Sequence, residues 1–337
     1  YLCYINHKKS NLNYLSLLTE RQISTLETTS FSFCENNMNQ KLLVFLLPNF
    51  LFGIFICGFF FKKQKTPTGN RKNTLASVCL KNNLNKARSN LDSHVANQLF
   101  VEHKHKFIYC EVPKVGCSNW KRTIFLLQSD FSAEASDIGH DDIHHTSLIK
   151  RLVSYPPALQ KEFLSNYTKV MFTRHPLERL VSAYRDKLLH SEPFYSTTVA
   201  NEIRAMFRKN KSSSEKVSFQ EFVSFIIAKP PHTLDIHWKP MFLLCDPCNI
   251  HYDIVGKYET LGLDSDHVLK VIGAPESMQY PSLKRYSSEK RTDGDMTLEY
   301  LRHLTFEQIE KIKKLYEMDF FLFNYTMKYE DYFSLNG

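Results

Sequence analysis

The hydrophobic positions of this chain alternate between the period of a strand and the period of a helix. β-Forming residues cluster at 107–112, and apolar residues then recur at helical spacing over 118–127. The same succession returns as a short apolar run at 170–173 and a helical pattern at 176–188. Strands that alternate with helices predict an α/β fold with a mainly parallel sheet, in which ligands bind at the carboxyl ends of strands.

Four further segments extend this pattern toward the C-terminus. Residues 219–227 and 305–316 predict helices, and 254–258 predict a strand. A helix is also expected over 264–272, with Asp264 as its N-cap. The apolar stripe expected to be buried on the last helix consists of Phe306, Ile309, Ile312 and Leu315.

Residues 42–61 form an almost continuous apolar run, close to the ~20 residues that a helix needs to span a bilayer. Lysines flank the run on both sides, as they flank membrane anchors. We therefore expect a signal anchor at 42–61, with a tail at 1–41 before it. Because the first methionine is Met38, residues 1–37 are interpreted as an extension of the gene model, with a genuine cytosolic tail as the alternative.

Residues 62–99 are rich in Lys, Asn, Ser and Thr and predict a stem, which leaves 100–337 as the globular domain. The orientation of the anchor stays open at this point. Basic residues after the run favour a cytosolic domain, whereas three sequons carry glycans only in a lumenal one. The sequons begin at Asn166, Asn210 and Asn324.

The composition favours a folded protein with anionic partners. Of 337 residues, 43% are hydrophobic and 23% are charged, which excludes wholesale disorder. The net charge of +8 raises the local concentration of phosphate, sulfate and carboxylate ligands. Nucleic acid fits that charge as well, but the chain carries no helix-turn-helix, zinc-finger or RNA-binding motif, so we expect no nucleic-acid partner.

The segment 110–122, predicted as strand, loop and helix, is the first candidate site. Such a loop directs backbone N–H groups and the positive end of a helix dipole at one point, where an anion can bind. Lys114 adds a positive charge, Gly116 permits close backbone approach, and Ser118 can cap the helix or contact a phosphate oxygen. The motif is not a Walker A loop, because its Lys precedes its only Gly.

The first motif is interpreted together with a second one further along the chain. Pro-Lys-Val-Gly-Cys-Ser-Asn-Trp-Lys-Arg at 113–122, followed by Arg-His-Pro-Leu-Glu-Arg-Leu-Val-Ser-Ala-Tyr-Arg-Asp-Lys at 174–187, resembles the two donor-binding boxes of the Golgi carbohydrate sulfotransferases. Within that family the chain is most similar to the chondroitin and GalNAc 4-O-sulfotransferases. The resemblance covers roughly 100–325.

The resemblance implies a P-loop-NTPase-like sulfotransferase fold, with a central, mainly parallel sheet flanked by helices. It implies 3′-phosphoadenylyl sulfate as the donor substrate and no metal. The residues that it assigns to the 5′-phosphosulfate are Pro113, Lys114, Val115, Gly116, Cys117, Ser118 and Asn119. Those that it assigns to the 3′-phosphate are Arg174, His175, Pro176, Leu177, Glu178, Arg179, Leu180, Val181 and Ser182.

Two of these positions, and one residue outside the boxes, receive specific roles. Lys114 is expected to neutralise charge on the leaving phosphate, as sulfuryl transfer requires. Arg174 is expected to chelate the 3′-phosphate bidentately. His237, in a shared His-Trp segment, is the hypothesis for the base that accepts the acceptor's proton, and a purely structural histidine is the alternative. Trp238 beside it offers an aromatic face for a sugar.

Two other clusters have a chemical and a plain interpretation. Residues 137–145 contain three histidines and three aspartates but no fixed ligand spacing, so a polar surface loop is favoured over a metal site. Cys245 and Cys248 favour a local or cross-loop disulfide in an oxidising lumen over zinc. With an odd number of cysteines beyond the anchor, at least one is unpaired, and Cys117 is interpreted as a packing residue.

The expected function is sulfuryl transfer to O-4 of GalNAc in chondroitin, in a type II Golgi membrane protein with a lumenal catalytic domain. A glycosaminoglycan or another GalNAc-containing glycan is the expected partner, together with the Golgi membrane. The alternatives are GalNAc on dermatan or glycoprotein glycans, an inactive glycan-binding relative, and a nucleotide kinase. The order of Lys and Gly in the loop counts against the kinase.

Overall fold

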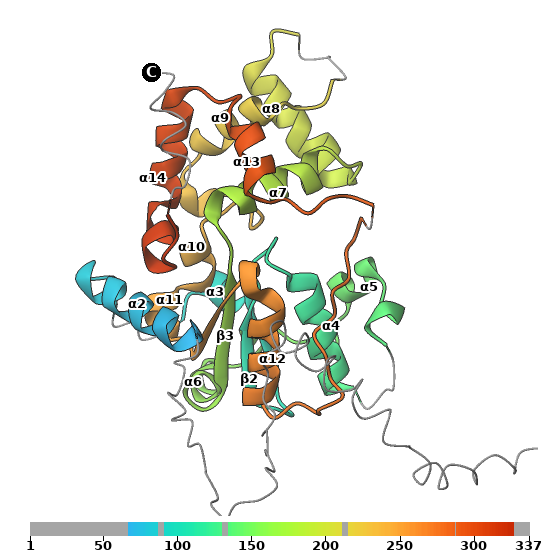
Figure 1. The fold of residues 1–337 in the computed structure, drawn as a ribbon, viewed down its shortest axis with the longest axis vertical. Coiled ribbons are helices and arrows are strands. Elements are labelled where there is room, and N and C mark those ends of the chain that lie inside the picture. Colours follow the sequence, from blue (N-terminus) through green and yellow to red (C-terminus); the bar gives the residue numbers. More distant parts are fainter. Residues whose placement is uncertain (1–66, 87–90, 130–133, 211–214, 287, 327–337) are drawn as a thin grey trace, which may run out of the picture. The chain divides into compact units, whose positions relative to one another are not determined.

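A sheet of four strands forms the centre of the fold (Figure 1). The computed structural model describes residues 67–86, 91–129, 134–210, 215–286 and 288–326. The strands lie in the order β1-β2-β3-β4, with β1 antiparallel to β2 and the other neighbours parallel. They span Leu99–Glu102, Phe107–Cys110, Thr168–Thr173 and Ile254–Lys257. The predicted α/β fold with a mainly parallel sheet is therefore confirmed.

Helices make the crossovers that parallel strands require. The helices between β2 and β3 are α4 (Cys117–Gln128), α5 (His140–His145) and α6 (Pro157–Asn166). Those between β3 and β4 are α7 (Pro176–Leu188), the π-helix η3 (Phe194–Val199), α8 (Ala200–Phe207), α9 (Phe219–Ile227), α10 (Met241–Cys245) and α11 (Pro247–Ile250). After β4 come α12 (Leu261–Val271), α13 (Gly294–Leu301) and α14 (Phe306–Leu322), and before β1 come α2 (Pro67–Lys81) and α3 (Ser93–Ala96). The carboxyl ends of β2, β3 and β4 consequently share one edge of the sheet.

Two hydrophobic clusters stabilise the fold. The first surrounds the sheet and includes Trp120, whose indole stacks on Tyr109 with ring centroids 5.5 Å apart. The second holds together α7, α8, α9, α13 and α14, which lie beyond the carboxyl end of β3 in Figure 1. Strands β2 and β3 therefore end where the first cluster, around the sheet, meets the second cluster, among the helices.

Most of the predicted elements are confirmed, and two details are wrong. Asp264 is not an N-cap, because α12 begins at Leu261 and the Asp264 carboxylate accepts from Arg71, Thr260 and the backbone N–H of Lys257. Phe306 is 71% exposed, since it occupies the first position of α14 and lies outside the stripe continued by Ile309 and Ile312.

The predicted stem is wrong over 67–81, where the chain forms α2 and packs against β4 and α14. Leu75 and Cys79 of this helix are buried, and Arg71 lies 2.5 Å from Asp264 in an ion pair. Its polar composition concealed this role, because only one face of the helix touches the domain. The compact fold therefore begins before residue 100.

Two disulfides cross the fold, so the cross-loop alternative for Cys245 and Cys248 is confirmed. Cys110, at the end of β2, pairs with Cys245, and Cys79 of α2 pairs with Cys248. Cys117 is unpaired and buried, as expected of a packing residue. The adjacent Cys245 and Cys248 thus attach α10 and α11 to two separate parts of the chain.

Removal of the Cys79–Cys248 bridge is expected to lower the free energy of unfolding by ~2–4 kcal/mol, because the bridge closes a long loop in the unfolded chain. The double variant Cys79→Ala/Cys248→Ala tests this by denaturant unfolding under non-reducing conditions. Cys117→Ala serves as the control, because it removes a cysteine and leaves both bridges. Equal unfolding midpoints for the wild-type and double-variant proteins would contradict the expectation.

Within the described ranges, no helix is both long and apolar enough to cross a bilayer. The predicted anchor at 42–61 and tail at 1–41 lie outside those ranges. Both remain predictions.

Candidate functional site

A polar pocket of about 240 Å³ lies at the shared carboxyl edge of β2, β3 and β4. Its walls come from the segments that follow these strands, from α5, from the outer face of α7 and from residues 283–292. From the first predicted box it is lined by Pro113, Lys114, Gly116, Cys117, Ser118 and Asn119, and from the second by Arg174 and Ser182. The two boxes, which are far apart in sequence, therefore meet at one site.

The loop from Pro113 to Gly116 enters α4 through two left-handed residues. Lys114 has φ 72° and Gly116, the N-cap, has φ 90°. A Cβ at Gly116 would lie 2.5 Å from the hydroxyl of Tyr280 and 2.8 Å from Leu261, so only glycine fits there. The loop thus turns tightly and brings the start of α4, where backbone N–H groups lack partners within the helix, into the pocket wall, as an anion site requires.

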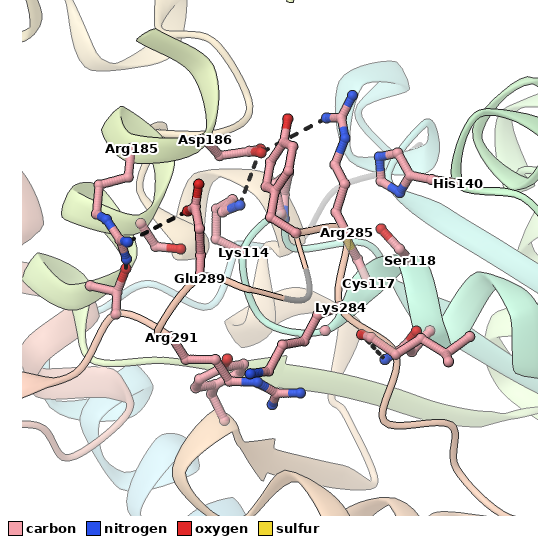
Figure 2. A pocket seen from close by; sticks show the side chains of 18 of the residues that line it. Lys114, Cys117, Ser118, His140, Arg185, Asp186, Lys284, Arg285, Glu289 and Arg291 are labelled. Atoms are coloured by element: carbon pink, nitrogen blue, oxygen red, sulfur yellow. Dashed lines mark hydrogen bonds and ion pairs between the residues drawn. The ribbon is translucent and has the colours of Figure 1, made fainter. Parts of the chain in front are cut away.

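Lys114 points into the pocket and pairs with Asp186 of α7, with Nζ 3.1 Å from Oδ2 (Figure 2). Burial raises the pKa of Asp186, but the ammonium groups of Lys114 and Lys187 outweigh it and lower that pKa to about 2. Arg285 approaches the other oxygen at 3.8 Å. Asp186 is therefore a carboxylate among three cations, which holds the Lys114 ammonium in place.

Arg174 is buried, with 2% of its surface exposed. One terminal nitrogen donates to the carbonyl of Lys114 at 3.2 Å, and the other donates to the carbonyl of Thr292. The guanidinium carbon lies 4.1 Å from the ring centroid of Tyr258. Arg174 therefore supports the loop through two of its five N–H groups and adds positive charge to the pocket wall, and its bidentate contact with the 3′-phosphate stays a prediction.

Most residues of the second box do not line the pocket. Arg179 is 1% exposed, and three of its five N–H groups donate to the carbonyls of Pro113, Ile236 and Lys239 at 2.7–2.9 Å, so its guanidinium is held inside the protein and is not part of the pocket wall. The remaining members of the two boxes that are absent from the pocket wall are Val115, His175, Pro176, Leu177, Glu178, Leu180 and Val181. Except for half-buried Glu178 they are buried, because they form the inner sides of the loop and of α7.

His237 lines the same pocket. Its Nδ1 lies 2.7 Å from Oδ1 of Asp235, and because a carboxylate only accepts, Nδ1 carries the proton and Nε2 is left to accept one. Burial lowers the pKa of His237 against the opposing effect of Asp235. Trp238, by contrast, is 2% exposed and packs edge-on against Phe222, so the predicted sugar-stacking face is wrong.

Sequence reasoning missed several groups in the pocket wall. His140 and His144 come from α5, within the segment predicted as a surface loop, and α5 packs against α4. The sequence feature that could have indicated these two residues is the density of histidines between the two boxes. The described part of the chain contains no group of three or more His, Cys, Asp and Glu side chains arranged to hold a metal. Other cations of the pocket wall that were not predicted include Arg122, Arg185, Lys187, Lys284 and Arg285.

Comparison with known proteins gives this pocket its context. A family model described as "Sulfotransferase family" matches residues 97–326. The chain belongs to this family. Both predicted boxes lie inside the matched range, so the resemblance that they indicate is confirmed.

The relatives of this sulfotransferase family member include carbohydrate sulfotransferases. Carbohydrate sulfotransferase 9 of Homo sapiens is 37% identical over 273 residues, covering 79% of this chain and 61% of the relative. Carbohydrate sulfotransferase 11 of Rattus norvegicus is 34% identical over 271 residues, covering 76% of this chain and 75% of the relative. The chain thus spans about three fifths of the length of the first of these. No solved structure matches the chain significantly.

Proposed function

We propose that this protein transfers the sulfuryl group of 3′-phosphoadenylyl sulfate to a hydroxyl of a glycan. The observation that carries the proposal is that Lys114, the tight loop ending at Gly116 and the start of α4 meet at the carboxyl edge of the sheet. Family membership and the carbohydrate sulfotransferases among the relatives support it. The parallel sheet with an anion-binding loop after β2 also supports the finer expectation of a P-loop-NTPase-like arrangement.

The residues present fit an anionic donor. The loop offers N–H groups, Gly116 leaves room for a phosphate to approach, and Lys114 supplies a cation at the same point. During transfer the acceptor oxygen forms a bond to sulfur, the bond from sulfur to the phosphate oxygen breaks, and 3′,5′-ADP leaves. Lys114 neutralises the charge that develops on that oxygen, and Nε2 of His237 accepts the proton of the acceptor hydroxyl.

We further propose O-4 of GalNAc in chondroitin as the acceptor position, in a type II Golgi membrane protein with a lumenal catalytic domain. The similarity of the two boxes to 4-O-sulfotransferases supports the acceptor. The apolar run at 42–61 supports the anchor, and the sequons and two disulfides support an oxidising lumen. GalNAc on dermatan or on glycoprotein glycans is the alternative acceptor.

Sulfate transfer by the full chain tests the proposal. Radiolabelled 3′-phosphoadenylyl sulfate is offered with chondroitin, dermatan or a desulfated glycoprotein glycan. We expect label on GalNAc O-4 of chondroitin, identified after enzymatic digestion to disaccharides. Label on another acceptor would overturn the acceptor assignment alone. Donor binding without transfer to any acceptor would favour an inactive glycan-binding relative, and phosphate transfer from ATP would favour a kinase.

A further inference from the structure

A series of polar side chains connects the sheet to the anion-binding loop. It runs from Glu111, which follows β2, through Lys121 of α4 and His144 of α5 to Ser118. The Glu111 carboxylate lies 2.5 Å from Lys121 Nζ, which lies 2.9 Å from Nδ1 of His144. Nε2 of the same ring lies 2.8 Å from Oγ of Ser118. We refer to these four residues as the Glu111–Ser118 network.

At the buried end of this network, the charges of Glu111 and Lys121 fix which group donates each hydrogen bond. Glu111 and Lys121 have side chains that are 5% and 4% exposed, and Arg151 holds the second Glu111 oxygen at 2.7 Å. Burial raises the pKa of Glu111, but Lys121 and Arg151 outweigh it and lower that pKa to about 2, so the carboxylate is charged. Lys121 is therefore a protonated ammonium, which can donate hydrogen bonds and cannot accept them.

The direction of the hydrogen bond from Lys121 determines the tautomer of His144. Because Lys121 donates to Nδ1, that nitrogen carries no proton, and neutral His144 has its proton on Nε2. His144 remains exposed overall, yet partial burial and the neighbouring ammonium lower its pKa to about 3. Nε2 therefore donates to Oγ of Ser118, and the hydroxyl proton of Ser118 is directed elsewhere.

We propose that His144 and Lys121 are positioning residues that direct the hydroxyl proton of Ser118 toward an anion in the loop. Ser118 occupies the second residue of α4 and lines the pocket beside Lys114. With its oxygen already accepting from His144, its hydroxyl adds a donor to the N–H groups of the helix start. The anion, under the proposed function, is the 5′-phosphate of the donor substrate, and the inference rests on that function only for this identity.

Two substitutions at one position separate this role from simple packing. The amide of His144→Gln carries an acceptor and a donor at its end, so it can serve both Lys121 and Ser118. The shorter amide of His144→Asn reaches the position of Nδ1 and keeps the Lys121 contact, but it cannot reach Ser118. Both variants are polar and preserve the same buried ion pairs, so their stabilities, measured by thermal unfolding, serve to match them.

Binding of 3′,5′-ADP to the full chain by calorimetry is the readout. We expect ~10-fold weaker binding for His144→Asn and for Ser118→Ala, since each loses one hydrogen bond to a charged group, and near wild-type binding for His144→Gln. The double variant His144→Asn/Ser118→Ala should bind no more weakly than Ser118→Ala alone, because both act through one hydroxyl. Additive losses, or equal binding by the Asn and Gln variants, would overturn the inference. Absence of binding by the wild-type protein would instead overturn the proposed function.

Discussion

Lys114→Ala is expected to lower kcat for sulfate transfer by ~10²–10³-fold, the cost of removing one charge-stabilising group from a transition state. Its ammonium lies in the pocket, 3.1 Å from Asp186, at the loop that is expected to hold the phosphosulfate. The loop N–H groups and the start of α4 remain in the variant. Binding of 3′,5′-ADP should consequently weaken far less than kcat falls.

The measurement is single-turnover transfer at saturating donor, with donor affinity determined separately. Lys161→Ala is the matched control, because it removes an exposed lysine of α6 that is not part of the pocket wall. Lys114→Arg should recover part of the rate, since it restores the charge with a different geometry. Wild-type kcat in Lys114→Ala would exclude Lys114 from the chemical step.

His237→Ala is expected to lower kcat by ~10²–10⁴-fold, the usual contribution of a general base. Asp235 holds Nδ1 at 2.7 Å, so Nε2 is the basic nitrogen. Because burial lowers the pKa of His237 below its ordinary value of 6.5, the neutral form persists into mildly acid solution. The wild-type rate should therefore fall only when the pH drops through this lowered pKa.

The pH profile of kcat distinguishes a base from a structural histidine. The acid limb should disappear in His237→Ala, leaving a low rate that does not vary over the same pH range. His232→Ala, which removes an exposed histidine from the 3₁₀ turn Pro231–Thr233, should keep both the rate and the limb. An unchanged profile in His237→Ala would leave the base to another group of the pocket.

The three parallel strands and the two boxes could be predicted, because each is a contiguous stretch of the sequence. Strand β3 and the helix that begins at Pro176 follow from local periodicity, and both boxes lie after strands that turned out to be parallel neighbours. Parallel strands present their carboxyl ends together, so Lys114 and Ser182 reach one pocket although they are distant in sequence.

Other features depend on contacts between distant residues, which local sequence patterns do not predict. Helix α2 resembles a solvated linker in composition, yet its disulfide, the ion pair of Arg71 and the buried side chain of Leu75 attach it to the domain. The resemblance assigns Arg179 to the 3′-phosphate, yet its guanidinium is buried and donates to three carbonyls that are distant in sequence. His144 becomes part of the pocket only because α5 folds back on α4.

The three carbonyls held by Arg179 have a mechanical consequence. One belongs to Pro113 in the loop and two belong to Ile236 and Lys239, on either side of His237. A planar guanidinium holds all three in one rigid geometry, whereas the three donors of a lysine rotate at the end of a flexible stem. The distance between Lys114 and His237 is thereby fixed when the protein folds. The site is preorganised, and a ligand need not spend its binding energy on bringing these two groups together.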